Sequence, residues 1–445
     1  MNRLFGTDGI RAVAGDYPLD HSTIYKIGKN LTALLRQKNQ FPHILIGQDT
    51  RSSGNWIQKA LFQGIRDSKG RAVSAGVIPT SGVAVLSKIK SFSSGIMISA
   101  SHNPYEYNGI KIFSSKGIKI KDSFEQELEK NIIKSKDIII PDSLELTTDD
   151  ELKNEYIKFV KSKFESEYFL KDIKVVIDCA NGASSNIAPL VFLELGLNTL
   201  AINSEPNGKN INSNCGSLFP NKLVHKVLET KADVGIAYDG DSDRAIFVDE
   251  KGRILNGDHT LFVLSKYMKE KGLLSSNKIV GTVMTNLGLE KALEDIGLQL
   301  VRTDVGDKYV YDEMIKTGSN LGGEQSGHTI LLDECPTGDG ILTSLKIIQI
   351  MIFKNRPLSD LYEGLHEYPQ VQKNVKVSKK EDFNRYPGIM KAIQKAEQEV
   401  RGKGRIKVRY SGTEPLARVM IEGKNKQEIE NLAQMISNSI SKELK

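Results

Sequence analysis

A strand–helix–strand pattern recurs three times along the chain, and this repetition constrains the fold more than any other feature. Each repeat joins two short apolar runs through one stretch of helical periodicity. The repeats comprise residues 43–47, 56–67 and 71–75; residues 174–178, 183–195 and 197–200; and residues 278–282, 288–296 and 298–301. Gly70, Gly196 and Gly297 stand where a left-handed residue would end each helix. Strands alternating with helices are typical of βαβ units, so we expect three similar α/β domains with largely parallel sheets.

The C-terminal part of the chain has a different pattern. Residues 405–410 and 418–422 alternate polar and apolar side chains, as half-buried strands do. A helix with one apolar stripe follows them, at Ile429, Leu432, Ile436 and Ile440. We therefore predict three mixed-sheet α/β domains plus a C-terminal α+β domain. A chain of 445 residues is too long for one hydrophobic core, so we expect several domains. The expected domains are residues 1–150, 151–253, 254–367 and 368–445.

Composition excludes several classes of protein. The 61 basic and 55 acidic residues are interspersed, without the basic, aromatic-rich block of a nucleic-acid binder. No apolar run approaches the ~20 residues that span a bilayer, and the first residues lack the apolar core of a signal peptide. Three widely spaced cysteines argue against a disulfide framework. We expect a cytoplasmic protein with neither a nucleic-acid nor a membrane partner.

The loop at residues 99–104 contains Ser101 and His102 and follows an apolar run at 95–98. An ordinary turn would explain such a loop. A serine hydrolase would need a G-x-S-x-G elbow, which is absent here. Ser101 could instead carry a transferable phosphoryl group, which brings a charge of about −1.5 to −2 and requires cations nearby.

The loop at residues 239–244 lies between two apolar runs and contains Asp239, Asp241 and Asp243. Three carboxylates this close repel one another unless a cation compensates them. Hard oxygen ligands suit Mg²⁺, so we predict a magnesium site. An EF-hand is disfavoured because Arg244 stands where the calcium loop requires glycine and because the flanks are strand-like rather than helical. Arg244 is better explained as a cation that faces a transferring phosphate.

Two further loops contain groups that could bind a phosphorylated sugar. Residues 322–328 form a glycine-rich turn in which a carboxylate and a hydroxyl could hold sugar hydroxyls, although a purely structural turn explains it equally well. Its candidate ligands are Glu324, Ser326 and His328. Residues 409–418 form a plausible anion nest. Its candidate ligands are Arg409, Ser411, Gly412, Thr413 and Arg418.

Five motifs in this order resemble the α-D-phosphohexomutase superfamily over the whole chain. They lie at residues 5–11, at 101–104 running on to 108–111, at 239–244, at 323–328 and at 411–415. Residues 305–310, 322–328 and 337–340 most resemble the bacterial phosphoglucosamine mutase branch. The resemblance implies four domains around a central active-site cleft and one Mg²⁺ per subunit.

The resemblance also implies a reaction. Phosphorylated Ser101 would convert glucosamine 6-phosphate into glucosamine 1-phosphate through glucosamine 1,6-bisphosphate, which is both intermediate and activator. The product would feed UDP-N-acetylglucosamine and cell-wall precursor synthesis. The implied metal ligands are Ser101, Asp239, Asp241 and Asp243. The implied catalytic residues are Ser101, His102, Lys111, Arg11 and Arg244. The substrate-binding residues would be Glu324, Ser326, His328, Arg409, Ser411, Gly412, Thr413 and Arg418.

Two residues depart from the pattern of the family. Ser242 stands where Gly or Ala is common, and Lys308 stands where phosphoglucosamine mutases commonly have Arg. A lysine lacks the bidentate geometry of a guanidinium. A phosphomannomutase or phosphoglucomutase shares all of this chemistry and remains an alternative. A non-catalytic phosphosugar-binding protein is the alternative from another class. The expected partner is a small phosphosugar, and a homodimer is left open.

Overall fold

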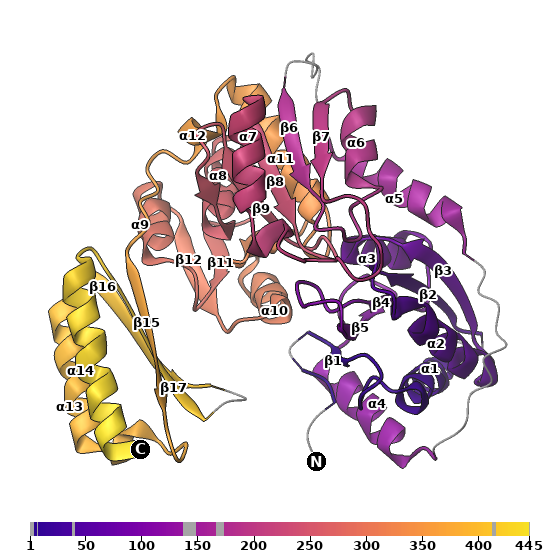
Figure 1. The fold of residues 1–445 in the computed structure, drawn as a ribbon, viewed down its shortest axis with the longest axis horizontal. Helices are drawn as coiled ribbons and strands as arrows, with labels where there is room; N and C mark the ends of the chain where they lie inside the picture. The colour runs from indigo at the N-terminus through magenta and orange to yellow at the C-terminus, as the bar shows by residue number, and fades with distance from the viewer. Residues whose placement is uncertain are drawn as a thin grey trace. The chain divides into compact units, whose positions relative to one another are not determined.

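The computed structural model describes residues 4–6, 8–37, 41–136, 148–165, 173–411 and 415–444. The chain divides into two compact units. Unit 1 comprises Met1–Met284 and Leu298–Glu363, and unit 2 comprises Thr285–Gly297 and Gly364–Lys445. Three of the four sheets lie in unit 1 and the fourth lies in unit 2 (Figure 1). Within the described ranges, we find no helix that is long and apolar enough to cross a membrane.

The first sheet of unit 1 has the strand order β1-β5-β4-β2-β3. Its strands are β1 (Ile10–Val13), β2 (His43–Gln48), β3 (Arg71–Val77), β4 (Ser94–Ile98) and β5 (Tyr107–Ser114). Strand β2 runs parallel to β3 and β4, whereas β5 is antiparallel to β4 and β1. The helices are α1 (His21–Arg36), α2 (Gly54–Asp67), α3 (Thr80–Ile89), α4 (Asp122–Lys134) and α5 (Asp150–Ser162).

Helices cover both faces of this sheet, as alternation along a strand requires. Ile44 and Ile46 of β2 share one core with apolar residues of α1, α2 and α4. Gly47, which points the other way, faces Val83 of α3. The sheet is therefore the middle of three layers.

The second sheet, β10-β9-β8-β6-β7, repeats this topology except at one edge, where β10 is the last of its sheet's strands along the chain and β1 the first of its own. Its strands are β6 (Lys174–Asp178), β7 (Asn198–Ile202), β8 (Val234–Tyr238), β9 (Ala245–Asp249) and β10 (Ile254–Leu255). The accompanying helices are α6 (Ala188–Glu194), η1 (Gly216–Leu218) and α7 (Asn221–Thr230). Strand β6 is parallel to β7 and β8, and β9 is antiparallel to β8.

The third sheet, β12-β11-β13-β14, has the same core pattern. Its strands are β11 (Lys278–Thr282), β12 (Gln299–Thr303), β13 (Leu321–Gly323) and β14 (Thr329–Leu331). The helices of this part are α8 (Gly257–Glu270), α10 (Asp307–Thr317), α11 (Gly340–Lys354) and α12 (Leu358–Leu361). The loop between the central parallel strands and the antiparallel neighbour therefore occurs three times, after β4, β8 and β13.

Unit 2 contains an antiparallel sheet of order β15-β17-β16. Its elements are α9 (Leu287–Asp295), β15 (Gln370–Lys376), η2 (Phe383–Arg385), α13 (Pro387–Val400), β16 (Gly404–Tyr410), β17 (Leu416–Gly423) and α14 (Lys426–Leu444). The predicted apolar stripe of α14 is buried, at Ile429, Leu432, Ile436 and Ile440. The sequence argument missed β15 and α13.

The predicted fold class of mixed-sheet α/β domains is confirmed, with one correction to a helix. In each sheet of unit 1 one strand, β5, β9 or β14, runs antiparallel to its central neighbour. Helix α6 begins at Ala188 and not at residue 183. Pro189 explains the late start, since proline lacks an N–H and is tolerated only in the first turn of a helix. The boundaries 1–150, 151–253, 254–367 and 368–445 stay a prediction.

The glycines that follow the three helices do not all behave as expected. Gly196 and Gly297 have positive φ angles of 84° and 70°, as predicted. After α2 it is instead Lys69 that takes the left-handed conformation, with φ 62°. The prediction for Gly70 is therefore wrong. A Cβ on that residue would lie 2.6 Å from the Thr32 side chain, so close packing explains the glycine.

Tyr156 of α5 joins three helices of unit 1 through its buried hydroxyl. The hydroxyl donates to Asp339 Oδ2 (2.9 Å) and lies 2.9 Å from Ser81 Oγ of α3. Asp339 is the N-cap of α11.

We expect Tyr156→Phe to destabilise the fold by about 1–3 kcal/mol, because the buried carboxylate of Asp339 loses a hydrogen-bond donor. Thermal unfolding would measure this. Tyr309→Phe, at a half-exposed position, is the control, and equal effects of the two changes would contradict the prediction.

Candidate active site

The serine loop, residues 99–106, begins where β4 ends and places Ser101 inside unit 1. Ser101 is 1% exposed and has a left-handed backbone, with φ 52°. Its Oγ donates a hydrogen bond to Asp239 Oδ2 at 2.5 Å. Its backbone N–H donates to Ser99 Oγ at 2.9 Å. The predicted serine therefore reaches the predicted metal loop, although 138 positions separate it from Asp239.

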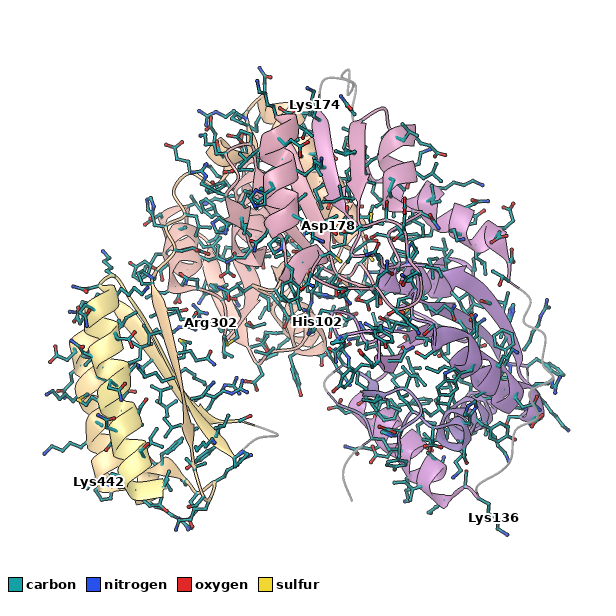
Figure 2. All side chains as sticks on the ribbon, in the orientation of Figure 1. His102, Lys136, Lys174, Asp178, Arg302 and Lys442 are labelled. Carbon is teal, nitrogen blue, oxygen red and sulfur yellow. The ribbon has the colours of Figure 1, made fainter. Side chains whose placement is uncertain are left out.

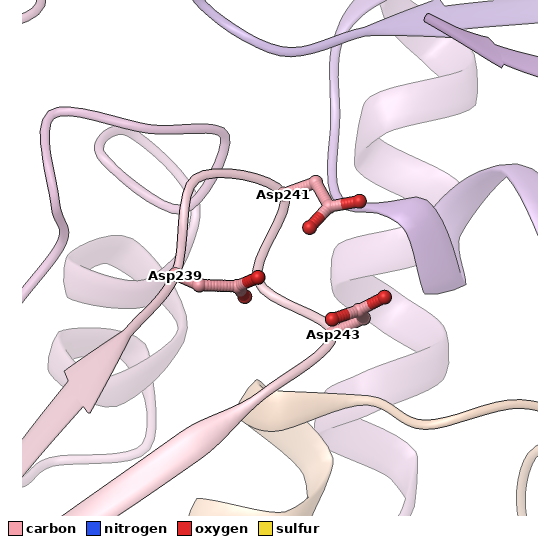
Figure 3. A group of neighbouring side chains, drawn as sticks. All are labelled: Asp239, Asp241 and Asp243. Carbon is pink, nitrogen blue, oxygen red and sulfur yellow. The ribbon is translucent and has the colours of Figure 1, made fainter. Parts of the chain in front are cut away.

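The metal loop, residues 239–244, connects β8 to β9 and contains three buried carboxylates. One oxygen from each of Asp239, Asp241 and Asp243 lies within 4.8 Å of the others. Figure 3 shows these side chains facing a common point from a single turn. Asp241 Oδ1 and Asp243 Oδ1 are buried and have no hydrogen-bond partner among the residues that the structure describes. Unsatisfied buried carboxylate oxygens are costly without a cation, so this site fits a hard divalent metal.

The pKa values of the aspartates in this loop reflect burial and the repulsion between their carboxylates. Burial raises the pKa of Asp239 well above its usual range, and the charges of Asp243 and Asp241 act in the same direction. Burial would also raise the pKa of Asp243. Lys111 and His328 outweigh that effect and hold its pKa well below the usual range. The carboxylates are thus unequal before any metal is added.

Lys111 of β5 is the cation closest to this cluster. Its Nζ lies 2.7 Å from Asp241 Oδ2, 3.1 Å from Asp243 Oδ2 and 3.3 Å from Asp8 Oδ2. Burial would lower the pKa of Lys111, but the three carboxylates outweigh it and hold the pKa well above its usual value. Lys111 is therefore an ammonium ion at neutral pH. A general base would need a shift in the opposite direction.

The predicted residue His102 contacts both Ser101 and Arg244. His102, labelled in Figure 2, has Nδ1 3.2 Å from Ser101 Oγ and 3.1 Å from Arg244 Nη1. Burial, together with the positive charges of Arg244 and Arg11, lowers the pKa of His102 to about 4. The imidazole is therefore neutral at pH 7. Arg11 of β1 pairs with Asp8, which also contacts Lys111.

The loop after β13 contains the predicted sugar-binding residues. Glu324 Oε1 accepts from the backbone N–H of Gly306 at 2.9 Å, and Ser326 Oγ lies 3.5 Å from Glu324 Oε2. His328 forms a β-bridge with Arg244, and its Nδ1 is 3.7 Å from Asp243 Oδ1. Three of the four predicted loops are thus neighbours within unit 1.

The predicted phosphate-binding residues lie in unit 2. Arg409 of β16 and Arg418 of β17 are direct cross-strand partners. Arg418 Nη2 is 3.4 Å from Ser411 Oγ, and Lys380 Nζ donates to the Ser411 carbonyl at 2.7 Å. Gly412 and Thr413 lie outside the described residues.

Lys308, where the family commonly has arginine, binds two carboxylates of α4. Its Nζ pairs with Asp122 and lies 3.2 Å from Glu125 Oε1. A single ammonium satisfies this pair of acceptors without the planar geometry of a guanidinium. Lys308 therefore forms an ion pair between α10 and α4.

Sequence reasoning missed several buried residues that hold these loops. Thr80 of α3 donates to Asp241 Oδ2 at 2.5 Å and also binds its backbone. Asp49 and Arg51, just after β2, bind the serine loop, as does Asn212. The only sequence signal was a pair of charged residues directly after an apolar strand. It could not identify their partners, which are mostly backbone carbonyls.

Comparison with known proteins places the chain in a family. Four models of phosphoglucomutase/phosphomannomutase match: alpha/beta/alpha domain I at residues 2–138, domain II at 154–252, domain III at 256–368 and the C-terminal domain at 373–439. A phosphoglucosamine mutase from Koribacter versatilis (strain Ellin345) is 44% identical, over 99% of this chain and 97% of the relative. The chain belongs to the phosphoglucosamine mutase branch of the α-D-phosphohexomutase family. The predicted membership is confirmed.

Solved structures of other phosphohexomutases share the fold. A phosphoglucomutase/phosphomannomutase family protein from Burkholderia thailandensis has a TM-score of 0.80 at 22% identity, covering 99% of this chain and 97% of that chain. N-acetylphosphoglucosamine mutase from Aspergillus fumigatus, solved with GlcNAc-6P and magnesium, has a TM-score of 0.66 at 18% identity, covering 99% and 95%. Likeness at this identity supports the fold alone, so the roles of individual residues remain predictions.

Ser242, the unusual residue of the metal loop, has a positive φ angle of 60°. Non-glycine residues are strained there, so we expect Ser242→Gly to stabilise the protein by about 0.5–1 kcal/mol. Thermal unfolding would detect the gain. Ser217→Gly is a matched control, because Ser217 Oγ is also buried without a hydrogen-bond partner in the described structure. Ser217 lies in η1 and does not have a positive φ angle. An equal gain in the control would contradict the explanation.

Asp243→Asn tests the metal site directly. Removing one of three charges should weaken Mg²⁺ binding at least about tenfold, because hard-cation affinity depends on the number of charged ligands. Isothermal titration calorimetry with Mg²⁺ measures this without any turnover. Asp295→Asn, an exposed position in α9, makes the same change of charge elsewhere. Unchanged affinity in Asp243→Asn would show that the metal does not bind this loop.

Proposed function

We propose that this chain interconverts glucosamine 6-phosphate and glucosamine 1-phosphate through a phosphorylated Ser101. One observation carries the proposal: Ser101 Oγ lies 2.5 Å from an oxygen of a buried aspartate cluster. The 44% identity to a phosphoglucosamine mutase, over nearly the full length of both chains, supports the choice of sugar. Three buried free cysteines fit a reducing compartment, the cytoplasm.

The proposed reaction consists of two phosphoryl transfers. The bond between phosphorus and Ser101 Oγ breaks as a bond forms to the C1 hydroxyl oxygen of glucosamine 6-phosphate, and that hydroxyl loses its proton. The resulting glucosamine 1,6-bisphosphate then reorients within the site. Its 6-phosphoryl group then returns to Ser101 Oγ, the C6 oxygen regains a proton, and glucosamine 1-phosphate is released. The enzyme ends phosphorylated, as it began.

The cationic residues near Ser101 are suited to stabilise the negative charge of the transferring phosphoryl group. Lys111 keeps its proton, and Arg244 and Arg11 are permanent cations, so they stabilise a phosphoryl group of about −2 charge. We assign Ser101, Asp239, Asp241 and Asp243 as ligands of one Mg²⁺. That ion, when bound, supplies positive charge for the transferring oxygens. His102, whose imidazole is neutral, orients Ser101 Oγ and Arg244.

Sugar and phosphate binding are assigned to the remaining loops. Hydrogen bonds with the sugar hydroxyls would come from Glu324, Ser326 and His328. In unit 2, Arg409 and Arg418 face each other across two strands. Two guanidinium groups and a hydroxyl are suited to bind a phosphate. We assign Arg409, Ser411 and Arg418 to phosphate binding, together with Gly412 and Thr413 of the same motif.

Ser101→Ala tests the phosphoserine. We expect turnover of glucosamine 6-phosphate, with Mg²⁺ and glucosamine 1,6-bisphosphate present, to fall by at least about 1,000-fold, because alanine cannot carry the phosphoryl group. Intact-mass analysis should find one phosphoryl group on the wild type and none on the variant. Normal turnover by Ser101→Ala would overturn the mechanism.

The sugar is tested by comparing kcat/KM for glucosamine 6-phosphate, mannose 6-phosphate and glucose 6-phosphate. Glucosamine 6-phosphate should give the highest value. A higher value for mannose or glucose would leave the phosphoserine chemistry in place and reassign the substrate. Binding of all three without turnover would instead favour a non-catalytic phosphosugar-binding protein.

A further inference from the structure

The strained backbone of Ser101 needs stabilising contacts that the proposed chemistry does not supply. A non-glycine residue at φ 52° costs about 1–2 kcal/mol. Such a conformation persists only where neighbouring groups hold it. The relevant groups are those that bind the carbonyls of the serine loop, since these bonds fix its peptide planes.

One buried guanidinium binds three of these carbonyls and also that of Tyr107, the first residue of β5. Arg51 is 2% exposed. Its Nη2 donates to the carbonyls of Ser101 (3.0 Å) and Asn103 (2.8 Å). Its Nη1 donates to the carbonyl of Tyr107 (3.0 Å) and to that of Pro104. A planar fork with fixed donors is suited to hold several acceptors at once.

Asp49 fixes the orientation of that guanidinium. Its Oδ2 accepts from Arg51 Nε at 2.9 Å and from Ser99 Oγ at 2.6 Å. Ser99 in turn accepts from the backbone N–H of Ser101 through the same hydroxyl. The N–H and the carbonyl of Ser101 are therefore both tied to one buried ion pair.

Asn212 binds the same loop from a distant part of the chain. It is 8% exposed and lies between β7 and η1. Its Nδ2 donates to the carbonyls of Ser101 (2.9 Å) and Asn103 (3.1 Å). The Ser101 carbonyl thus accepts from two side chains, one on each lone pair. The space is tight, because a Cβ on Gly240 would lie 2.5 Å from that carbonyl oxygen.

We propose that Arg51 and Asn212 form a carbonyl clamp that positions Ser101 for phosphoryl transfer. The inference rests on the proposed function. The clamp holds the serine loop in its left-handed turn, and this turn directs Oγ toward Asp239. Neither side chain touches the reacting atoms, so both are positioning residues.

The clamp should affect the chemical step more than substrate binding. A displacement of about 1 Å at the reacting atom can cost about 100-fold in rate. The sugar-binding and phosphate-binding residues proposed above lie on other loops. Loss of the clamp should therefore lower kcat while KM for glucosamine 6-phosphate stays nearly constant.

Asn212→Gly tests the amide side chain without disturbing the backbone conformation. Asn212 has φ 58°, a conformation that glycine adopts freely, so the change removes mainly the donor. We expect kcat for glucosamine 6-phosphate to fall about 10- to 100-fold, with KM within about twofold. Asn214→Gly is the matched control, since Asn214 is exposed and has φ 52°. The control should keep kcat within about twofold.

Arg51→Lys is the second variant, and it keeps the charge while removing the planar fork. We expect a loss in kcat of about 100-fold or more. Arg253→Lys is its control, because Arg253 Nε pairs with Asp249 at 2.7 Å away from the serine loop. Unfolding temperatures of all four variants report any loss of fold separately.

A direct readout is the rate at which glucosamine 1,6-bisphosphate phosphorylates Ser101, followed by intact mass. Slower phosphorylation in Asn212→Gly and Arg51→Lys than in their controls supports the clamp. Rates equal to the controls, or a rise in KM with unchanged kcat, overturn it while leaving the proposed function in place. If the wild type fails to convert glucosamine 6-phosphate, the proposed function falls, and the phosphorylation rates still decide the clamp.

Discussion

Mutual repulsion among three buried carboxylates governs the polar structure of unit 1. Asp239, Asp241 and Asp243 come from one turn, and at low effective dielectric each raises the energy of the others. The surrounding protein offsets this with the ammonium of Lys111 and the guanidinium of Arg244. Two carboxylate oxygens still lack a hydrogen-bond partner in the described residues. A bound cation is the simplest remaining compensation.

Hydrogen bonds to the metal loop and to the serine loop also connect distant parts of the chain. Thr80 of α3 binds the metal loop, whereas Asn212 binds the serine loop. The sheet around β2 and the sheet around β6 therefore each contribute a residue to the loop of the other. Reciprocal contacts of this kind fix the serine relative to the carboxylates more tightly than either loop could alone. Phosphoryl transfer depends on such positioning, since charge and orientation supply most of the catalysis.

Topology explains why the loops meet. In each sheet of unit 1, a central parallel strand is followed by a strand that returns antiparallel: β4 to β5, β8 to β9 and β13 to β14. The connecting loop carries Ser101 in the first sheet, the aspartates in the second and the candidate sugar ligands in the third. One structural position thus carries three different sets of candidate site residues.

The sequence by itself determined the repeated α/β architecture and the aspartate loop, because these follow from local periodicity and from residue types a few positions apart. Ser101 stood out only together with the other loops and the resemblance to the family, because its own loop also fits an ordinary turn. It also suggested a turn at Gly70, where close packing and not backbone conformation requires glycine. Only the tertiary structure decided that Arg51 and Asn212 hold Ser101, since their partners are backbone carbonyls that carry no mark in the sequence. It also decided that Lys111 keeps its proton. The pKa of a buried lysine depends on which carboxylates surround it, and those come from residues more than a hundred positions away along the chain.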